Sequence, residues 1–132
     1  MRRLRFAVVL AAAFALCAGA AARAHWVTPE EVVAELDAPA TRTSLDVLSV
    51  ARDARLPRLL VVRVGPRWTE LDPALRREAA EAWRELWRHA VPDGVLAVTD
   101  ASGRSLVSFD AAGRAQLRDP PSGPAHPGAA GS

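Results

Sequence analysis

The first 24 residues of this 132-residue chain have the pattern of a secretory signal peptide, which restricts the folding unit to residues 25–132. Three arginines lie within the first five residues, and an unbroken run of apolar and small residues covers positions 6–22. The sequence Ala22-Arg23-Ala24 then fits the small-x-small pattern of a cleavage site. We therefore expect cleavage after Ala24, release into the bacterial periplasm or the medium, and a mature chain that begins at His25.

A retained membrane anchor is the alternative interpretation of the same segment. The apolar run at 6–22 is near the short limit for crossing a bilayer core about 30 Å thick. Arg23 and the cleavage pattern come directly after it, and the sequence has no second long apolar run. We therefore expect the leader to be removed, with no stable membrane insertion afterwards.

Removal of the leader changes the charge of the chain. Four of the 17 basic residues lie in the leader, whereas all 15 acidic residues come after it, so the mature chain has a net charge of −2 instead of +2. The densest basic group after the leader is the pair Arg76-Arg77. This pattern argues against nucleic acid as a partner, because binding to phosphates needs a concentrated positive surface.

The single cysteine, Cys17, lies inside the leader, so the mature chain can form no disulfide. The residue before it, Leu16, is not the small residue that a lipoprotein signal requires. Small exported domains often depend on disulfides for stability. This domain must instead depend on its apolar core, and the 108 residues left after cleavage suit one domain.

Two segments near the start of the mature chain carry different signals. Thr28-Pro29-Glu30-Glu31 is a capping box with proline at the first helical position, and it predicts a short helix. That helix should end near Asp37, because Pro39 disfavours helical geometry in the residue before it. Residues 44–57 fit either a strand or a short helix, and we interpret 45–52 as a strand.

A central strand and a long helix come next in the chain. Residues 59–64 have apolar side chains on both faces of a predicted strand, which should therefore be central and covered on both sides, at least in part. Asp72 and Pro73 predict the N-cap and first residue of a helix that ends near Ala90. The apolar stripe predicted for this helix consists of Leu75, Ala79, Ala82, Trp83, Leu86 and Ala90, with Ala80 and Trp87 on its flank.

The last part of the domain is predicted as a β-meander of three short strands, at 95–99, 105–109 and 114–117. Both connectors, 100–104 and 110–114, read Asp-Ala-x-Gly-Arg. The aspartate suits the start of a type I turn, and the glycine supplies the left-handed residue that closes a hairpin. Each connector offers a single acidic residue, so neither matches a calcium-binding loop.

These elements predict one small α+β domain over residues 25–118. Its sheet has four or five antiparallel or mixed strands and ends in the meander, with the long helix packed on the sheet and the short N-terminal helix at an edge or end. The sequence pattern allows strands 59–64 and 95–99 to be parallel or antiparallel. Residues 119–132 are mostly proline, glycine, serine and alanine and are predicted to be a disordered tail.

A tryptophan-rich group is the first candidate binding site. Arg67, Trp68, Arg76 and Trp87 could line a cleft that takes an anionic or planar ligand. The alternative is that the tryptophans form the core, because a domain without disulfides needs large apolar side chains. Among Trp68, Trp83 and Trp87, Trp87 is predicted to be the one that is partly exposed, since it lies on the flank of the stripe.

The second candidate is a metal site at His25. A mature chain that begins with histidine offers an α-amine and an imidazole, and copper(II) favours such nitrogen ligands. The alternative is that cleavage leaves a histidine at this position by chance.

The sequence contains no recognisable catalytic motif. After the leader there is no cysteine, no serine in a G-x-S-x-G elbow, no H-E-x-x-H motif and no glycine-rich phosphate loop. We therefore expect a non-catalytic exported domain without a cofactor, which binds an envelope protein or a small ligand. Copper binding through His25 and an enzyme with a dispersed site are the alternatives.

Overall fold

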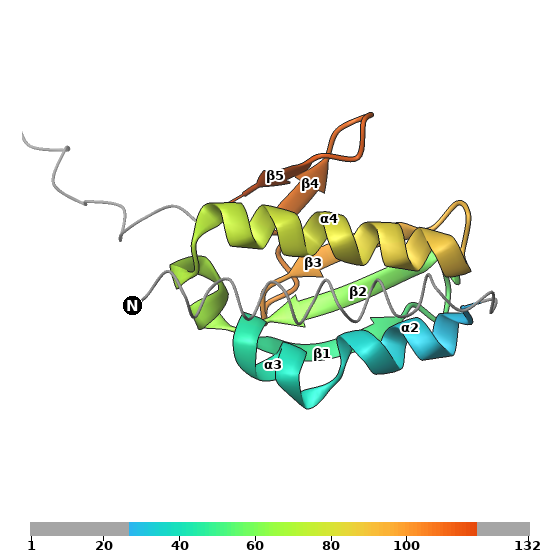
Figure 1. Cartoon of the computed structure of the whole chain (residues 1–132), viewed down its shortest axis with the longest axis horizontal. Helices are drawn as coiled ribbons and strands as arrows, with labels where there is room; N and C mark the ends of the chain where they lie inside the picture. Colours follow the sequence, from blue (N-terminus) through green and yellow to red (C-terminus); the bar gives the residue numbers. More distant parts are fainter. Residues whose placement is uncertain (1–26, 119–132) are drawn as a thin grey trace, which may run out of the picture.

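The computed structural model describes residues 27–118 (Figure 1). Within this range the chain forms three α-helices, one 3₁₀-helix and five strands. In chain order they are α2 (Pro29–Leu36), α3 (Pro39–Leu45), β1 (Val47–Arg52), β2 (Leu59–Val64), η1 (Pro66–Glu70), α4 (Pro73–Ala90), β3 (Val95–Thr99), β4 (Val107–Phe109) and β5 (Ala115–Leu117). The predicted signal peptide (1–24), His25 and the predicted tail (119–132) lie outside the described residues.

The predicted capping box starts the first helix as expected. The backbone N–H of Glu31 donates to Thr28 Oγ1 at 3.2 Å, and the backbone N–H of Thr28 donates to Glu31 Oε2 at 2.9 Å. A second helix, α3, comes next and was not predicted: Pro39 ends the first helix and also occupies the first turn of the next one. The predicted strand at 45–52 is therefore shorter, and it begins at Val47 after Asp46, whose φ is 54°.

Three strands form the main sheet in the order β1-β2-β3. β1 pairs with β2 antiparallel, and β2 pairs with β3 parallel, which decides the question that the sequence left open. α4 is the crossover between the two parallel strands, and α2, α3 and α4 all lie on the same face of the sheet (Figure 1). The core fills the space between this helical layer and the sheet, with Trp68, Trp87, Leu60, Val32, Val62, Val64 and Val98 as its largest fully buried side chains.

The prediction of one four- or five-stranded sheet that ends in a meander was wrong in its detail. β4 and β5 form a separate two-stranded sheet, which meets β3 through a single bridge between Thr99 and Ser105. The hairpin bends away because it packs against α4. There the backbone N–H of Ala115 donates to Glu81 Oε1 at 2.9 Å, and the Arg84 guanidinium lies 5.6 Å from the centre of the Phe109 ring.

The same hairpin explains why the buried face of α4 differs from the predicted stripe. The fully buried line consists of Arg76, Ala80, Trp83 and Trp87. The predicted stripe residues Leu75, Ala79, Leu86 and Ala90 are only partly buried. Because the hairpin covers the side of α4 that carries Glu81 and Arg84, the buried sector is turned toward that side. The prediction that Trp87 is the partly exposed residue among Trp68, Trp83 and Trp87 is therefore wrong, because Trp87 is fully buried.

The two predicted hairpin turns are present. Gly103 and Gly113 have φ values of 86° and 81°, in the left-handed region that glycine adopts without strain. The backbone N–H of Gly103 donates to the carbonyl oxygen of Asp100 at 3.1 Å, and that of Gly113 donates to Asp110 at 2.9 Å. The repeated Asp-Ala-x-Gly-Arg pattern thus encodes two turns of the same kind.

Candidate functional site

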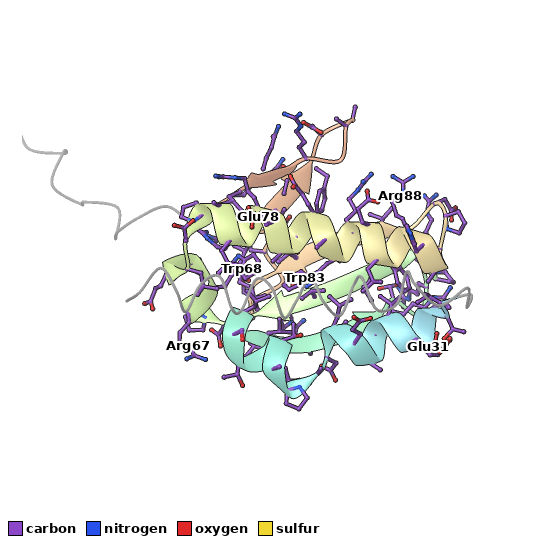
Figure 2. The ribbon with its side chains drawn as sticks, in the orientation of Figure 1. Glu31, Arg67, Trp68, Glu78, Trp83 and Arg88 are labelled. Atoms are coloured by element: carbon purple, nitrogen blue, oxygen red, sulfur yellow. The ribbon has the colours of Figure 1, made fainter. Side chains whose placement is uncertain are left out.

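Three of the four residues predicted to line a ligand cleft lie inside the core. Trp68 and Trp87 are fully buried, and Arg76 is 3% exposed. Figure 2 shows Trp68 and Trp83 between α4 and the sheet, whereas Arg67, the residue before Trp68 in η1, is directed outward. Arg67 instead reaches Asp46: its backbone N–H donates to Asp46 Oδ2 at 2.8 Å, and its guanidinium lies 3.5 Å from Asp46 Oδ1.

The buried tryptophans are held by one another and by the backbone. The rings of Trp68 and Trp83 stack with centroids 5.6 Å apart. Trp87 Nε1 donates to the carbonyl oxygen of Arg58 at 2.8 Å, and the Arg52 guanidinium lies 5.7 Å from the Trp87 ring centre. The geometry matches the alternative that we gave for these tryptophans, the core. Ligand binding at this group stays a prediction.

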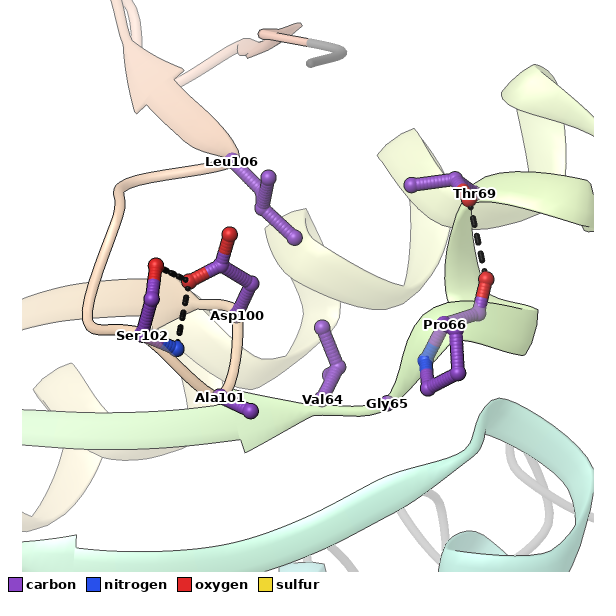
Figure 3. Close-up of a pocket in the computed structure, with 8 residues that line it drawn as sticks. All are labelled: Val64, Gly65, Pro66, Thr69, Asp100, Ala101, Ser102 and Leu106. Atoms are coloured by element: carbon purple, nitrogen blue, oxygen red, sulfur yellow. Dashed lines mark hydrogen bonds between the residues drawn. The ribbon is translucent and has the colours of Figure 1, made fainter.

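A cavity of about 370 Å³ lies elsewhere, beyond the carboxyl ends of the parallel strands β2 and β3 (Figure 3). In open α/β sheets, ligands bind preferentially at this end of the strands. The cavity is lined by Val64, Gly65, Pro66, Thr69, Asp100, Ala101, Ser102 and Leu106. Asp100 is the one titratable residue in this lining.

The polar groups of this cavity form hydrogen bonds within the loops that line it. Asp100 Oδ1 accepts hydrogen bonds from the Ser102 hydroxyl at 2.6 Å, from the Ser102 backbone at 2.9 Å and from the Arg104 backbone at 3.0 Å. The hydroxyl bond from Ser102, followed by the backbone bond from Arg104, lowers the pKa of Asp100. The Thr69 hydroxyl donates to the carbonyl oxygen of Pro66 at 2.9 Å. These bonds organise the two loops, and they leave the walls of the cavity mostly apolar.

The main sheet has a second face that no described helix covers. Side chains alternate between the faces of a strand; those of Leu60, Val62 and Val64 point into the core, so their neighbours point away from the helices. We define the open sheet face as the residues on this side: Leu48, Ser49, Ala51, Leu59, Val61, Arg63, Val95, Ala97 and Thr99. The consecutive residues Leu48 and Ser49 both belong to it because the register of β1 shifts between Val47 and Ser49. None of its apolar members packs in the core cluster, and Val95 and Leu48 are 47% and 43% exposed.

A polar row crosses the open sheet face near the carboxyl end of β2. The strand register places Ser49 opposite Arg63 and Arg63 opposite Thr99, and the bridge from Thr99 adds Ser105. Arg63 is exposed, and within residues 27–118 its side chain has no ion pair or hydrogen bond. Thr99 is 9% exposed, and its hydroxyl is buried with no hydrogen-bond partner among the described residues.

The sequence indicated that β2 has apolar side chains on both faces, but we did not predict that one of these faces would be left without a helix. The run Leu59-Leu60-Val61-Val62 predicted a strand with apolar side chains on both sides, and we expected both sides to be covered, at least in part. The structure places all three helices on one side. For the arginine that follows this run, Arg63, the sequence allows a buried pair with a carboxylate or contact with solvent, and we expected the second. The structure shows Arg63 exposed, and the strand register places it beside the hydroxyl-bearing residues Ser49 and Thr99.

Neither a search for metal-binding clusters nor comparisons with known proteins add a candidate site. The described residues contain no group of three or more His, Cys, Asp or Glu side chains that could hold a metal ion. The predicted metal ligand, His25, lies outside them. Over the same part of the chain, no helix is both long and apolar enough to cross a membrane. Comparisons with models of protein families, with curated proteins and with solved structures find no match.

Proposed function

We propose that this protein is an exported, non-catalytic binding domain that docks a partner protein on its open sheet face. The observation that carries the proposal is the apolar character of this face beside a parallel strand pair. Sheets made only of parallel strands are almost always covered on both faces, and this mixed sheet contains one parallel pair, β2–β3. In the described part of the chain, β2 and β3 are covered on one face alone.

The energetics favour such docking. Burial of an exposed valine or leucine side chain contributes about 1.5–3 kcal/mol. Leu48 and Val95 are each more than two-fifths exposed, and Leu59, Val61 and Ala97 lie partly exposed between them. The hydrogen bonds of the cavity residues are already used in the turn, so the open sheet face is the better candidate for binding.

Photocrosslinking tests the proposal. A photoreactive residue at Val95 is expected to give an adduct with a partner protein in producing cells, whereas one at Glu78, on the exposed side of α4, is the matched control and is expected to give none. Purified partner should bind Val95→Asp at least tenfold more weakly than the native protein, since a charge would then be buried in the interface. Adducts only with lipid, only with a second copy, or equally at both positions would contradict the proposal.

The export part of the proposal rests on the leader. Mass spectrometry of the periplasmic or secreted fraction should give a mature chain that begins at His25. An intact chain recovered in the membrane fraction would contradict cleavage.

A further inference from the structure

We infer that the partner presents an α-helix with one carboxylate in its apolar stripe, and that this carboxylate binds Arg63. The inference rests on the docking proposed above and adds the chemistry of the partner to it. It depends on the polar row Ser49–Arg63–Thr99, which lies in an otherwise apolar face.

The charge of the open sheet face indicates the charge of its occupant. The face carries one positive group, Arg63, and no acidic residue. A partner that covers it must pair the guanidinium, because a buried charge without a partner costs several kcal/mol. A carboxylate pairs with arginine through two parallel hydrogen bonds. Ser49 and Thr99 lie on either side of Arg63, and the exposed Ser49 adds a hydroxyl donor for the same group.

Thr99 supplies an independent argument for a bound acceptor. Its hydroxyl is buried and has no partner in residues 27–118. A buried donor without a partner costs about 1–3 kcal/mol. A partner carboxylate at Arg63 would give this hydroxyl an acceptor once the Thr99 side chain turns its hydroxyl toward the open sheet face.

Two other occupants fit the charge less well. A second copy that docks through the same face would bring Arg63 against an identical positive face, with no acidic residue to separate the two charges. The chain's own apolar segment, 6–22, contains no acidic residue, so it would bury Arg63 without a counter-ion. A partner with an acidic residue avoids both the repulsion between two positive faces and the burial of Arg63 without a counter-ion.

The dimensions of the face suit one helix. Three strands about 4.8 Å apart span about 10 Å between the outer two, close to the diameter of an α-helix with its side chains. Strands of this length run for about 20 Å, which corresponds to roughly 13 residues of helix. Arg63 is the fifth residue of the six in β2, so the carboxylate is expected within about a turn of one end of the docked helix.

A pair of synthetic helical peptides provides the test on the full chain. Each peptide has about 15 residues and a leucine and alanine stripe, with either glutamate or glutamine in the stripe one turn from its end. We expect the glutamate peptide to bind about tenfold more tightly than the glutamine peptide, and to shift the NMR signals of Val61, Val95 and Ala97.

Three variants test which side chains cause the preference for the glutamate peptide. Arg63→Met should remove it, and Thr99→Val should reduce the affinity for the glutamate peptide alone. Arg77→Met is the matched control, because it removes the same charge from the exposed face of α4 and should leave the preference unchanged.

The outcomes separate this inference from the docking on which it rests. If both peptides bind the open sheet face equally, docking stands and carboxylate recognition is overturned. If neither peptide shifts the signals of the face, docking itself fails. Concentration-dependent dimerisation through Val95, or contacts between residues 6–22 and Val61 in the free full chain, would assign the face to another occupant and overturn the inference.

Discussion

Trp87 and Arg58 join the long helix to the start of the parallel strand pair. The carbonyl oxygen of Arg58 accepts one hydrogen bond from Trp87 Nε1 and another from the backbone N–H of Val95, both at 2.8 Å. One acceptor therefore fixes both the position of α4 and the register between β2 and β3. This double role gives a fully buried tryptophan a structural purpose beyond the apolar area it buries.

Trp87→Phe should destabilise the protein more than Trp68→Phe. Both indoles are fully buried, but Trp68 Nε1 has no hydrogen-bond partner among the described residues. The two variants therefore lose similar packing, and only the first also loses the hydrogen bond to Arg58. We expect Trp87→Phe to cost about 1 kcal/mol more in the free energy of unfolding, measured with urea. Equal losses would show that the bond contributes nothing to stability.

Gly94→Ala should destabilise the protein by about 1–3 kcal/mol, through overpacking against Trp87. A Cβ atom at Gly94 would lie 2.6 Å from Trp87 Cδ1 and 2.8 Å from the carbonyl oxygen of Val91. Neither the buried ring nor the backbone can move away freely. Gly103→Ala is the control, because a Cβ there meets no atom within 4 Å and the cost comes only from its φ of 86°. Thermal unfolding with an unchanged midpoint for Gly94→Ala would refute this close contact.

Local signals were the part of the fold that the sequence predicted well. The capping box at Thr28, the N-cap at Asp72 and the two Asp-Ala-x-Gly-Arg turns each depend on residues within five positions of one another. The chemistry of such motifs is complete in the local sequence. Their positions were therefore predictable without knowledge of the rest of the fold.

Long-range packing was the part that the sequence did not determine. The helical periodicity of residues 73–90 gives an apolar side, but the position of the β4–β5 hairpin decides which side chains are fully buried. The same holds for the candidate site. The apolar run in β2 predicted two covered faces, whereas the placement of α2, α3 and α4 on one side leaves the face with Arg63 open.

Ser102→Ala should raise the pKa of Asp100 toward its ordinary value of 3.8. The Ser102 hydroxyl is the largest cause of the lowered pKa, and it donates to Asp100 Oδ1 at 2.6 Å. NMR titration of the Asp100 carboxyl measures the shift. Ser105→Ala is the control, because the Ser105 hydroxyl donates to the carbonyl oxygen of Val107 instead. An unchanged pKa in Ser102→Ala would contradict the assigned cause.

The free energy of unfolding should decrease at acidic pH because of the Asp100 carboxyl group. The folded pKa of Asp100 lies below the unfolded value, so its contribution is fully present above about pH 4 and is lost as pH falls through the folded value. Burial raises the pKa of Glu35, which acts in the opposite sense: its contribution is present in acid and is lost as pH rises through its folded value. We therefore expect Asp100→Asn to reduce the acid loss of stability seen in urea titrations, and Glu35→Gln to increase it. A steeper acid loss in Asp100→Asn would contradict the sign.

Thr99→Val should leave the stability of the free protein unchanged or raise it by up to about 1 kcal/mol, because it removes a buried hydroxyl that has no partner in residues 27–118. Thr69→Val is the matched comparison: the Thr69 hydroxyl donates to the carbonyl oxygen of Pro66 at 2.9 Å, so its loss should cost about 0.5–1.5 kcal/mol. Urea unfolding of both variants measures the difference. If Thr99→Val were the more destabilising of the two, the hydroxyl of Thr99 would already have an acceptor in the free protein. A partner carboxylate could then gain nothing from it.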